Sequence, residues 1–436
     1  MAPRVISLLA AFILLAGCAA NRPAPSKEDP MNRIAEAYVK LVLAVGQHDA
    51  DYVDAYYGPP EWKAEAEAKK QPLPEIYGEA ETLIADLSAH PAAPGDEEIV
   101  RLRHQYLLRQ LQSMVSRIDL VSRQKMAFDE ESKALYDAVA PTHDIAYFQR
   151  ALDKLEKAVP GDGPLADRVE AFRQRFVIPR DRLDAVFKAA IDECRRRTLQ
   201  HVELPPGESF VVEYVTNKSW SGYNWYKGGY HSVIQVNTDL PIFIDRAIDL
   251  ACHEGYPGHH VYNTLLEKNL VRDRGWIEFS AYPLFSPQSL IAEGTANFGI
   301  EVAFPGEERT AFERERLYPL AGLDPAGAPR YTEVLGLLQE LGYAGNEAAR
   351  RYLNGEISRQ EAAAWLTRYA LMAPDRAAQR VRFIDQYRSY VINYNLGQDL
   401  VRQYVEKRGG TSDRPEQRWK EFAALISSPR LPSGLR

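Results

Sequence analysis

The sequence contains little cysteine and no run of basic residues. Cysteine supplies 3 of the 436 residues, so disulfide staples are not what builds the core, and a hydrophobic content of 45% is enough to build one. The formal charge is -7 at pH 7. Because phosphate neutralisation needs clustered Lys and Arg, we expect no nucleic-acid partner. A chain of this length is too long for one small core and short for three domains.

The apolar run at the N-terminus is shorter than a permanent transmembrane helix. Arg4 supplies a positive charge, and residues 5–15 form the apolar run, which together are typical of a targeting segment. The run ends in Leu-Ala-Gly-Cys at residues 15–18, which resembles the cleavage box of bacterial lipoproteins. The resemblance implies a signal peptide over residues 1–17, lipidation of Cys18, export, and membrane contact through that lipid alone.

The residues after the cleavage box predict how the chain is anchored and divided. Ala19 follows the cysteine, with no Asp at that position, so the outer membrane, facing the periplasm, is the expected destination in a two-membrane bacterium. Residues 18–30 are rich in Pro, Ala and polar residues and predict a flexible tether. Residues 31–436 are expected to form one helical catalytic unit, with 31–200 and 201–436 as candidate lobes. The oligomeric state stays open.

The mature chain keeps two cysteines, Cys194 and Cys252. They could pair in an oxidising envelope. However, Cys252 directly precedes a histidine inside a predicted buried helix. We therefore expect two separate buried thiols, with a disulfide as the alternative.

Apolar periodicity predicts a mainly α fold with a small β-sheet. No internal repeat of fixed period is present. Residues at helical spacing begin near residue 32 and recur over 97–123, 144–159 and 180–199. Two runs rich in β-branched and aromatic residues predict strands at 210–215 and 230–236. Loops are expected at 219–229, 270–287 and 324–330, and a helix is expected to start near Pro241.

The helix after the predicted strands carries His-Glu-Gly-Tyr-Pro-Gly-His-His at residues 253–260. This stretch holds three of the nine histidines and a carboxylate. A catalytic zinc site uses two neutral imidazoles, a third ligand from elsewhere, and a glutamate that activates water. The usual form is H-E-x-x-H on an unbroken helix, and this stretch departs from that form.

The phase of this helix predicts which side faces a cleft. Its packed stripe follows the spacing i, i+3, i+4 and i+7 and consists of Ile244, Ala247, Ile248 and Ala251. At about 100° per residue, His253 lies roughly opposite that stripe. Asp249, one turn earlier, could accept a hydrogen bond from the His253 ring and orient it.

Pro257 stands where the shorter motif has its second histidine, and proline cannot bind a metal. It also lacks an N–H and clashes with the carbonyl four residues earlier, that of His253, so we expect the helix to open over residues 255–258. If this bulge absorbs two residues, His259 becomes the second ligand. With helical phase kept, His260 would lie about 10 Å further along, too far to share one zinc. We therefore expect His259 as the ligand, with His260 as the alternative and otherwise beside the site.

The third ligand is expected on a following helix. Glu293 lies in an otherwise apolar run, residues 290–298, where an unpaired carboxylate would be costly to bury and a metal would remove that cost. Asn297, one turn later, lies near the same face and could hydrogen-bond the site. Glu301, two turns later, is the alternative ligand.

The pattern His-Glu-x-x-Pro-Gly-His-His at 253–260, followed by Glu-Gly-x-Ala at 293–296, resembles the HExxPGHH family, long catalogued as domain of unknown function 885. The resemblance also takes in the strand ending in Asn237 and the pair Gly397-Gln398. It implies a bacterial zinc peptidase of the gluzincin type, often exported. The implied fold is a largely helical body with a small sheet beside the cleft.

The resulting hypothesis is metal-assisted cleavage of peptide bonds in the cell envelope. One Zn2+ per chain is held by His253, His259 and Glu293, and Glu254 accepts the proton of water and later donates it to the leaving amine. The candidate donors to the developing oxyanion are Tyr394, which is preferred because it precedes the Gly-Gln pair, and Tyr390, Arg388 and His231.

Peptide is the expected partner, and a few residues are candidates for contacting it. A strand beside the metal helix can bind an extended peptide, which makes Tyr230 and Asn237 candidates. Arg388 or Arg382 could bind a terminal carboxylate. The competing interpretation is a non-catalytic envelope lipoprotein that serves as a binding or scaffold module. The presence of Glu254 argues against it, because a structural metal site needs no adjacent base. A third interpretation is another hydrolase, acting on cell-wall peptides or esters.

Overall fold

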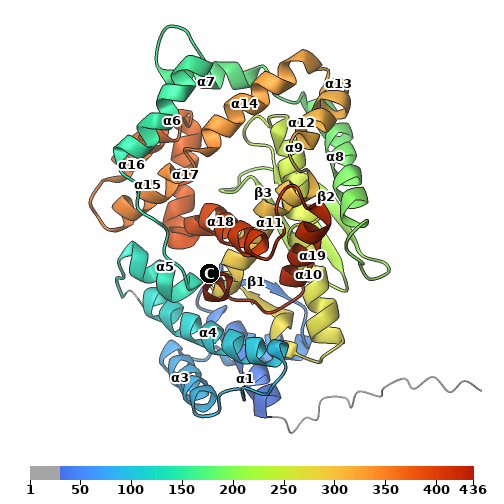
Figure 1. Ribbon diagram of the computed structural model, residues 1–436. Coiled ribbons are helices and arrows are strands. Elements are labelled where there is room, and N and C mark those ends of the chain that lie inside the picture. The colour runs from blue at the N-terminus through green and yellow to red at the C-terminus, as the bar shows by residue number, and fades with distance from the viewer. Residues whose placement is uncertain (1–29, 123) are drawn as a thin grey trace, which may run out of the picture.

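The computed structural model describes residues 30–122 and 124–436 and is mainly helical (Figure 1), which confirms the predicted fold class. The predicted signal peptide, Cys18 and the tether up to residue 29 lie outside the described residues. Within those two ranges, no helix combines the length and the apolar character needed to cross a membrane.

The N-terminal half is built from amphipathic helices. Most of them bury an apolar stripe, as Phe148, Leu152 and Leu155 do on α6, and Asp144 caps that helix by accepting from the amide of Tyr147 at 2.8 Å. The short helix over residues 60–69 has no buried residue. The elements are α1 (Pro30–Val45), α2 (Pro60–Lys69), α3 (Leu73–Ala89), α4 (Glu98–Val121), α5 (Phe128–Tyr136), α6 (Ile145–Ala158), α7 (Leu165–Gln174), the 3-10 turn η1 (Arg180–Arg182) and α8 (Leu183–Thr198). Of these, α1, α4, α6 and α8 confirm the four periodic segments of the sequence.

A three-stranded sheet follows, with the order β2 (Ser209–Val215), β4 (His231–Asn237), β3 (Gly222–Gly228). β2 runs parallel to β4, and β3 runs antiparallel to it. The prediction of a loop over residues 219–229 is wrong, because β3 occupies most of it. Its glycines and serine argue for a loop locally, but pairing with β4 and the Trp225–Gln235 hydrogen bond of 3.0 Å decide for a strand.

A second, two-stranded sheet joins distant parts of the chain. β1 (Val53–Tyr56) pairs antiparallel with β5 (Ala281–Pro283). Strands this short carry no periodic signal, and the region of β5 was expected to be loop. The loop expected at 270–287 also contains the 3-10 turn η4 (Ile277–Ser280), and the one at 324–330 contains η6 (Pro325–Gly327) and the start of α14.

The remaining helices build the C-terminal half around the site. The helix expected near Pro241 begins at Asp245. The elements are α9 (Asp245–Leu250), the π-helical turn η2 (Ala251–Gly255), α10 (His259–Leu266), the π-helical turn η3 (Glu267–Arg272), α11 (Pro287–Ala303), α12 (Glu308–Phe312), the π-helical turn η5 (Glu313–Leu317), α13 (Tyr318–Ala321), α14 (Ala328–Gln339), α15 (Ala344–Leu353), α16 (Arg359–Tyr369), α17 (Pro374–Tyr387), η7 (Arg388–Val391), α18 (Ile392–Lys407), α19 (Pro415–Ile426) and η8 (Pro432–Leu435).

The core positions the site through α11, which is buried along almost its whole length. The largest hydrophobic cluster draws on the chain from Ala35 to Leu435. α11 lies beside α18 (Figure 1), and a Cβ added at Gly294 would be 2.5 Å from the backbone of Gly397. The two helices can approach this closely because glycine has no side chain. This contact fixes the position of Glu293 and gives the Gly397-Gln398 pair a packing role. The proposed lobe boundary stays a prediction.

Candidate active site

The helix that carries His253 widens before it breaks. α9 passes into the π-helical turn η2, in which the amide of Tyr256 donates to the carbonyl of Ala251 at 3.1 Å. The chain then leaves helical geometry until α10 begins at His259. The predicted opening over residues 255–258 is confirmed, and the widening begins earlier, at Ala251.

Gly258 makes this break possible. Its amide donates to the carbonyl of Cys252 at 2.9 Å, and a Cβ on this residue would be 1.9 Å from the carbonyl oxygen of His253. No other residue fits at that distance. Pro257 was expected to face this carbonyl, but Gly258 lies against it. The effect on the site is the expected one, because His259 returns to the side of His253.

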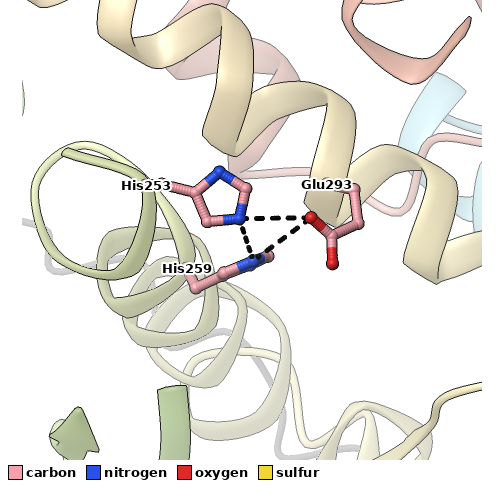
Figure 2. Close-up of side chains that lie close together, drawn as sticks. All are labelled: His253, His259 and Glu293. Carbon is pink, nitrogen blue, oxygen red and sulfur yellow. Dashed lines mark hydrogen bonds and ion pairs between the residues drawn. The ribbon is translucent and has the colours of Figure 1, made fainter. Parts of the chain in front are cut away.

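His253, His259 and Glu293 point toward one another from η2, α10 and α11 (Figure 2). The Nε2 atoms of the two imidazoles are 3.1 Å apart. Oε2 of Glu293 is 3.2 Å from Nε2 of His253 and 3.7 Å from Nε2 of His259. Donors on a tetrahedral zinc with bonds of about 2.0–2.1 Å are roughly 3.3 Å from each other. The triangle of donors therefore has the size that zinc needs.

The chemistry of the donors also fits a metal. Oε2 of Glu293 is buried and lacks a hydrogen-bond partner among the described residues, which would be costly without a cation. Within the described residues, these three side chains form a group that could hold a metal ion. Two imidazoles and one carboxylate are a donor set of catalytic zinc sites that keep a fourth position open.

Two further side chains orient the ligands. Nδ1 of His253 is 2.9 Å from Oδ1 of Asn297, whose amide nitrogen donates to the carbonyl of Tyr394 at 3.1 Å. The amide oxygen can only accept, so Nδ1 of His253 carries the proton and Nε2 keeps its lone pair for a metal. The hydroxyl of Tyr390 donates to Oε1 of Glu293 at 2.7 Å and leaves Oε2 to face the imidazoles.

Asp249 does not have its predicted role. The prediction that it accepts from His253 is wrong, because Asn297 occupies that position. Asp249 instead forms ion pairs with Arg246 at 3.1 Å and Arg309 at 2.8 Å. Asp249 lies on α9, one turn before His253, where Arg246 of the same helix and Arg309 of α12 contact its carboxylate.

Glu254 and the ligands line one cavity of about 1040 Å³. Glu254 is buried, and burial raises its pKa, although His253 and His259 oppose this effect. Its Oε1 lies 2.9 Å from the position that a Cβ on Gly222 would take, so the carboxylate sits directly beside β3. A buried carboxylate with a raised pKa next to a metal-ligand group has the character of a general base.

His259 and Glu293 shift each other's pKa in opposite directions. Burial alone would lower the pKa of His259, but the Glu293 carboxylate outweighs it and raises that pKa to about 9. Burial would raise the pKa of Glu293, and the two imidazoles instead hold it well below its usual range. Without a metal, a proton on His259 therefore balances the carboxylate.

Three residues near the group were missed or placed differently by sequence reasoning. Asp54 of β1 lines the cavity and hydrogen-bonds Tyr223, and burial raises its pKa to about 6. Tyr390 was considered as an oxyanion donor, and the structure places it on Glu293. Asp54 and Tyr223 lie 169 residues apart, and no local pattern could have brought them together.

Tyr394 lines the same cavity as predicted, beside Tyr390. Burial raises the pKa of its hydroxyl well above the usual value. The hydroxyl therefore stays protonated at neutral pH and can donate a hydrogen bond.

The alternative ligands face other partners. His260 is fully buried, with Nδ1 2.9 Å from the hydroxyl of Ser232 and Nε2 3.0 Å from Glu208, so it packs behind the group and not beside it. Adjacent helical residues point about 100° apart, which explains why only one of the two histidines meets His253. Glu301 forms an ion pair with Arg402 and accepts from Gln398 at 2.7 Å.

The three predicted substrate contacts lie outside the lining of the cavity. Arg388 pairs with the buried Glu131 at 2.7 Å, because that carboxylate needs a cation. The Asn237 side chain donates to the carbonyls of Lys218 and Trp220 at 3.1 and 2.9 Å and closes the turn before β3. The ring of Tyr230 is covered by Arg272, with the guanidinium 4.9 Å from its centre.

The two mature cysteines are buried and free. The sulfur atoms of Cys194 and Cys252 lie 2.6 Å apart, on α8 and η2. The expectation of two buried thiols without a disulfide is therefore confirmed, and the packing of α8 directly against the turn that carries His253 brings the two sulfur atoms together.

Neither a protein-family model nor a curated protein sequence matches this chain, so the resemblance to the HExxPGHH family stays a prediction. The solved structures that match this chain include two proposed lipoproteins and a carboxypeptidase. A proposed lipoprotein from Colwellia psychrerythraea is 15% identical with a TM-score of 0.51, covering 82% of this chain and 68% of that one. A proposed lipoprotein of unknown function from Shewanella oneidensis is 12% identical with a TM-score of 0.49, covering 87% and 78%.

The third similar structure is an M32 carboxypeptidase from Deinococcus radiodurans R1, at 13% identity with a TM-score of 0.36, covering 90% of this chain and 89% of that one. At these identities, the similarity to the Colwellia protein shows a shared fold alone. Only the geometry of the site in this chain therefore bears on its activity.

Proposed function

We propose that this protein is a zinc-dependent hydrolase, and specifically a metallopeptidase. The observation that carries the proposal is the convergence of His253, His259 and Glu293 at distances of 3.1 to 3.7 Å, with Glu254 on the same cavity. A structural metal site would need no base beside it and tends to fill all four positions with protein ligands.

A bound zinc would supply Lewis acidity and lower the pKa of a coordinated water toward 7. The residues of this chain do the remaining work. Glu254 accepts a proton from the attacking water and passes it to the leaving nitrogen. The raised pKa of Glu254 lies closer to neutral pH than that of an ordinary carboxyl group, so this residue can take up and release a proton during the reaction. Tyr394 donates to the oxygen that gains negative charge, since its hydroxyl stays protonated.

The edge strand β3 supports a peptide as the substrate. The carbonyl of Ser221 accepts from the amide of Asn237 at 2.9 Å, so Ser221 faces β4. Backbone groups alternate along an antiparallel strand, so those of Gly222 and Asn224 face away from β4. Gly222 also lies beside Glu254. An extended peptide bound along this edge would bring its amide bonds past the base.

We further propose that the protein is exported and anchored through lipid on Cys18, in the outer membrane facing the periplasm. The signal-like sequence of residues 1–18 supports this, as does the fold shared with the proposed lipoprotein from Colwellia psychrerythraea. The substrates would then be peptides of the cell envelope.

The test combines metal content with cleavage of a mixed peptide library by wild type and Glu254→Gln. We expect about one zinc per chain in both proteins, and a loss of activity of at least about 100-fold in the variant, since general base catalysis contributes about 10²–10⁴-fold. Zinc binding without cleavage of any peptide by wild type would instead favour a non-catalytic binding module. Absence of zinc binding would contradict the central claim.

A further inference from the structure

The cavity that holds the catalytic group is lined by six arginines, and most of them are neutralised by the protein itself. Four form ion pairs with carboxylates: Arg246 and Arg309 with Asp249, Arg173 with Asp245, and Arg418 with Glu301. Arg376 donates to the carbonyl of Pro241 at 2.9 Å. These five therefore have a partner in the wall of the cavity.

Arg380 of α17 is different. Among residues 30–122 and 124–436 it has no ion pair and no hydrogen bond. Its guanidinium instead makes cation–π contacts with two aromatic rings. Its guanidinium lies 4.7 Å from the centre of the Phe383 ring and 5.6 Å from that of Tyr394. Burial lowers the pKa of Arg380, although Tyr394 and Glu293 oppose this effect. Arg380 is thus a half-buried cation that lines the site without an anion of its own.

The surroundings of Arg380 select the kind of anion that it can bind. A guanidinium presents paired N–H donors that match a planar carboxylate. The same cavity is lined by the carboxylates of Asp54, Glu254 and Glu293, which would repel a doubly charged phosphate more strongly than a singly charged carboxylate. The aromatic faces of Phe383 and Tyr394 hold the guanidinium in place, so little order is lost when it binds.

We propose that Arg380 binds a carboxylate of the substrate, so that the enzyme prefers peptides with a carboxylate close to the bond that is cut. This inference rests on the proposed peptidase function. The carboxylate has two possible sources: the C-terminus of the peptide, which would make the protein a carboxypeptidase, or an Asp or Glu side chain next to the scissile bond.

The test uses zinc-loaded protein and three N-acetylated hexapeptide libraries. The first has a free C-terminal carboxylate, the second a C-terminal amide, and the third a C-terminal amide with one fixed internal Glu. Cleavage positions and rates are read by mass spectrometry for wild type, Arg380→Ala, Arg380→Lys and Arg382→Ala. Arg382 is the matched control, because it is an exposed arginine on the same helix and lies outside the lining of the cavity.

A carboxylate contact predicts that wild type cleaves one carboxylate-bearing library at least about tenfold faster than the plain amide library. Preference for the free acid, with cuts near the C-terminus, identifies the terminal carboxylate as the source. Preference for the third library, with cuts beside Glu, identifies the side chain. Arg380→Ala should remove the preference, Arg380→Lys should keep part of it, and Arg382→Ala should leave it unchanged.

A binding measurement separates failure of this inference from failure of the proposed function. Calorimetry measures peptide binding to Glu254→Gln and to the double variant that also carries Arg380→Ala. The ligands are one N-acetylated hexapeptide with an internal Glu and its counterpart with Gln at that position, each with a C-terminal acid and with a C-terminal amide. Loss of discrimination between carboxylate and amide in the double variant supports the role of Arg380, even if wild type cleaves no library. Equal rates on all three libraries, or a preference that survives Arg380→Ala, would overturn it.

Discussion

At the scale of single residues, the orientation of His253 depends on Asn297. The amide oxygen of Asn297 fixes the proton on Nδ1, 2.9 Å away, and directs the Nε2 lone pair toward His259 and Glu293. Loss of such an outer hydrogen bond costs about 10–100-fold in metal affinity. We expect Asn297→Ala to weaken zinc binding by this factor, as measured by competition with a chromogenic chelator.

The two glutamates of α11 provide the control for this measurement. Glu301 faces Gln398 and Arg402, away from the histidines. Glu301→Gln should therefore bind zinc as wild type does, whereas Glu293→Gln should lose nearly all affinity. Wild-type affinity in Asn297→Ala would show that packing alone holds the His253 ring.

The proton that His259 holds in the absence of a metal predicts how metal binding depends on pH. The pKa of His259 is raised from 6.5 to about 9 in the metal-free protein, so the folded state holds this proton over the whole interval between those values. A zinc ion would bind the neutral imidazole and would therefore have to displace this proton. Near neutral pH we expect release of about one proton per zinc, and an affinity that rises about tenfold per pH unit and levels off above pH 9.

Calorimetry in buffers with different protonation enthalpies measures the number of protons released. The exposed His90, at the end of α3, is the control, because His90→Gln should release the same number as wild type. An affinity that does not change across this pH interval would show that His259 is neutral without metal.

At the scale of elements, the break between η2 and α10 brings the two histidines together. A Cβ on residue 258 would lie 1.9 Å from the carbonyl oxygen of His253, so Gly258→Ala must move η2 and α10 apart. We expect it to abolish zinc binding and to lower the free energy of unfolding by about 1–3 kcal/mol, as overpacking does. Zinc titration and urea unfolding measure the two effects.

Gly78 is the matched control for this substitution. It lies within α3 with open space around its Cβ position, so Gly78→Ala should bind zinc normally and gain about 0.5–1 kcal/mol from helix propensity. A Gly258→Ala variant with wild-type affinity for zinc would show that the break does not depend on glycine.

The same element shows which features could be predicted from sequence. The helix phase, the opening near Pro257 and the choice of His259 follow from local geometry, because each concerns residues within two helical turns. The identity of the side chain that hydrogen-bonds the His253 ring does not follow from local geometry. Asn297 was expected to hydrogen-bond the site, but it is 44 residues away from His253, and Asp249 was expected on that ring because it is close in sequence. The strand β3 was missed for a similar reason, since pairing with β4 outweighs its weak local preference.

At the scale of the whole molecule, the candidate site is assembled from elements spread along the chain. β1 contributes Asp54, η2 and α10 the histidines, α11 Glu293, and η7 Tyr390. Arg388 and Glu131 are 257 residues apart, so the sequence could not show that this arginine is already paired. Sequence patterns identify residue types suited to metal chemistry, and the packing of distant helices decides which of them meet.

Because the ligands come from three elements, a metal should stabilise the whole fold. In the proposed function, zinc binds the triangle formed by His253, His259 and Glu293, and the unfolded chain offers no such site. At free zinc near 1000 times the dissociation constant, this stabilises the native state by about 4 kcal/mol. We expect chelation of zinc to lower the melting temperature by several degrees in wild type and in Glu254→Gln, which keeps all three ligands. His253→Ala should melt at the same temperature with and without zinc. If wild type also melted independently of zinc, the buried oxygen of Glu293 would have to be balanced by the proton on His259 alone, and the group would be a structural ion pair.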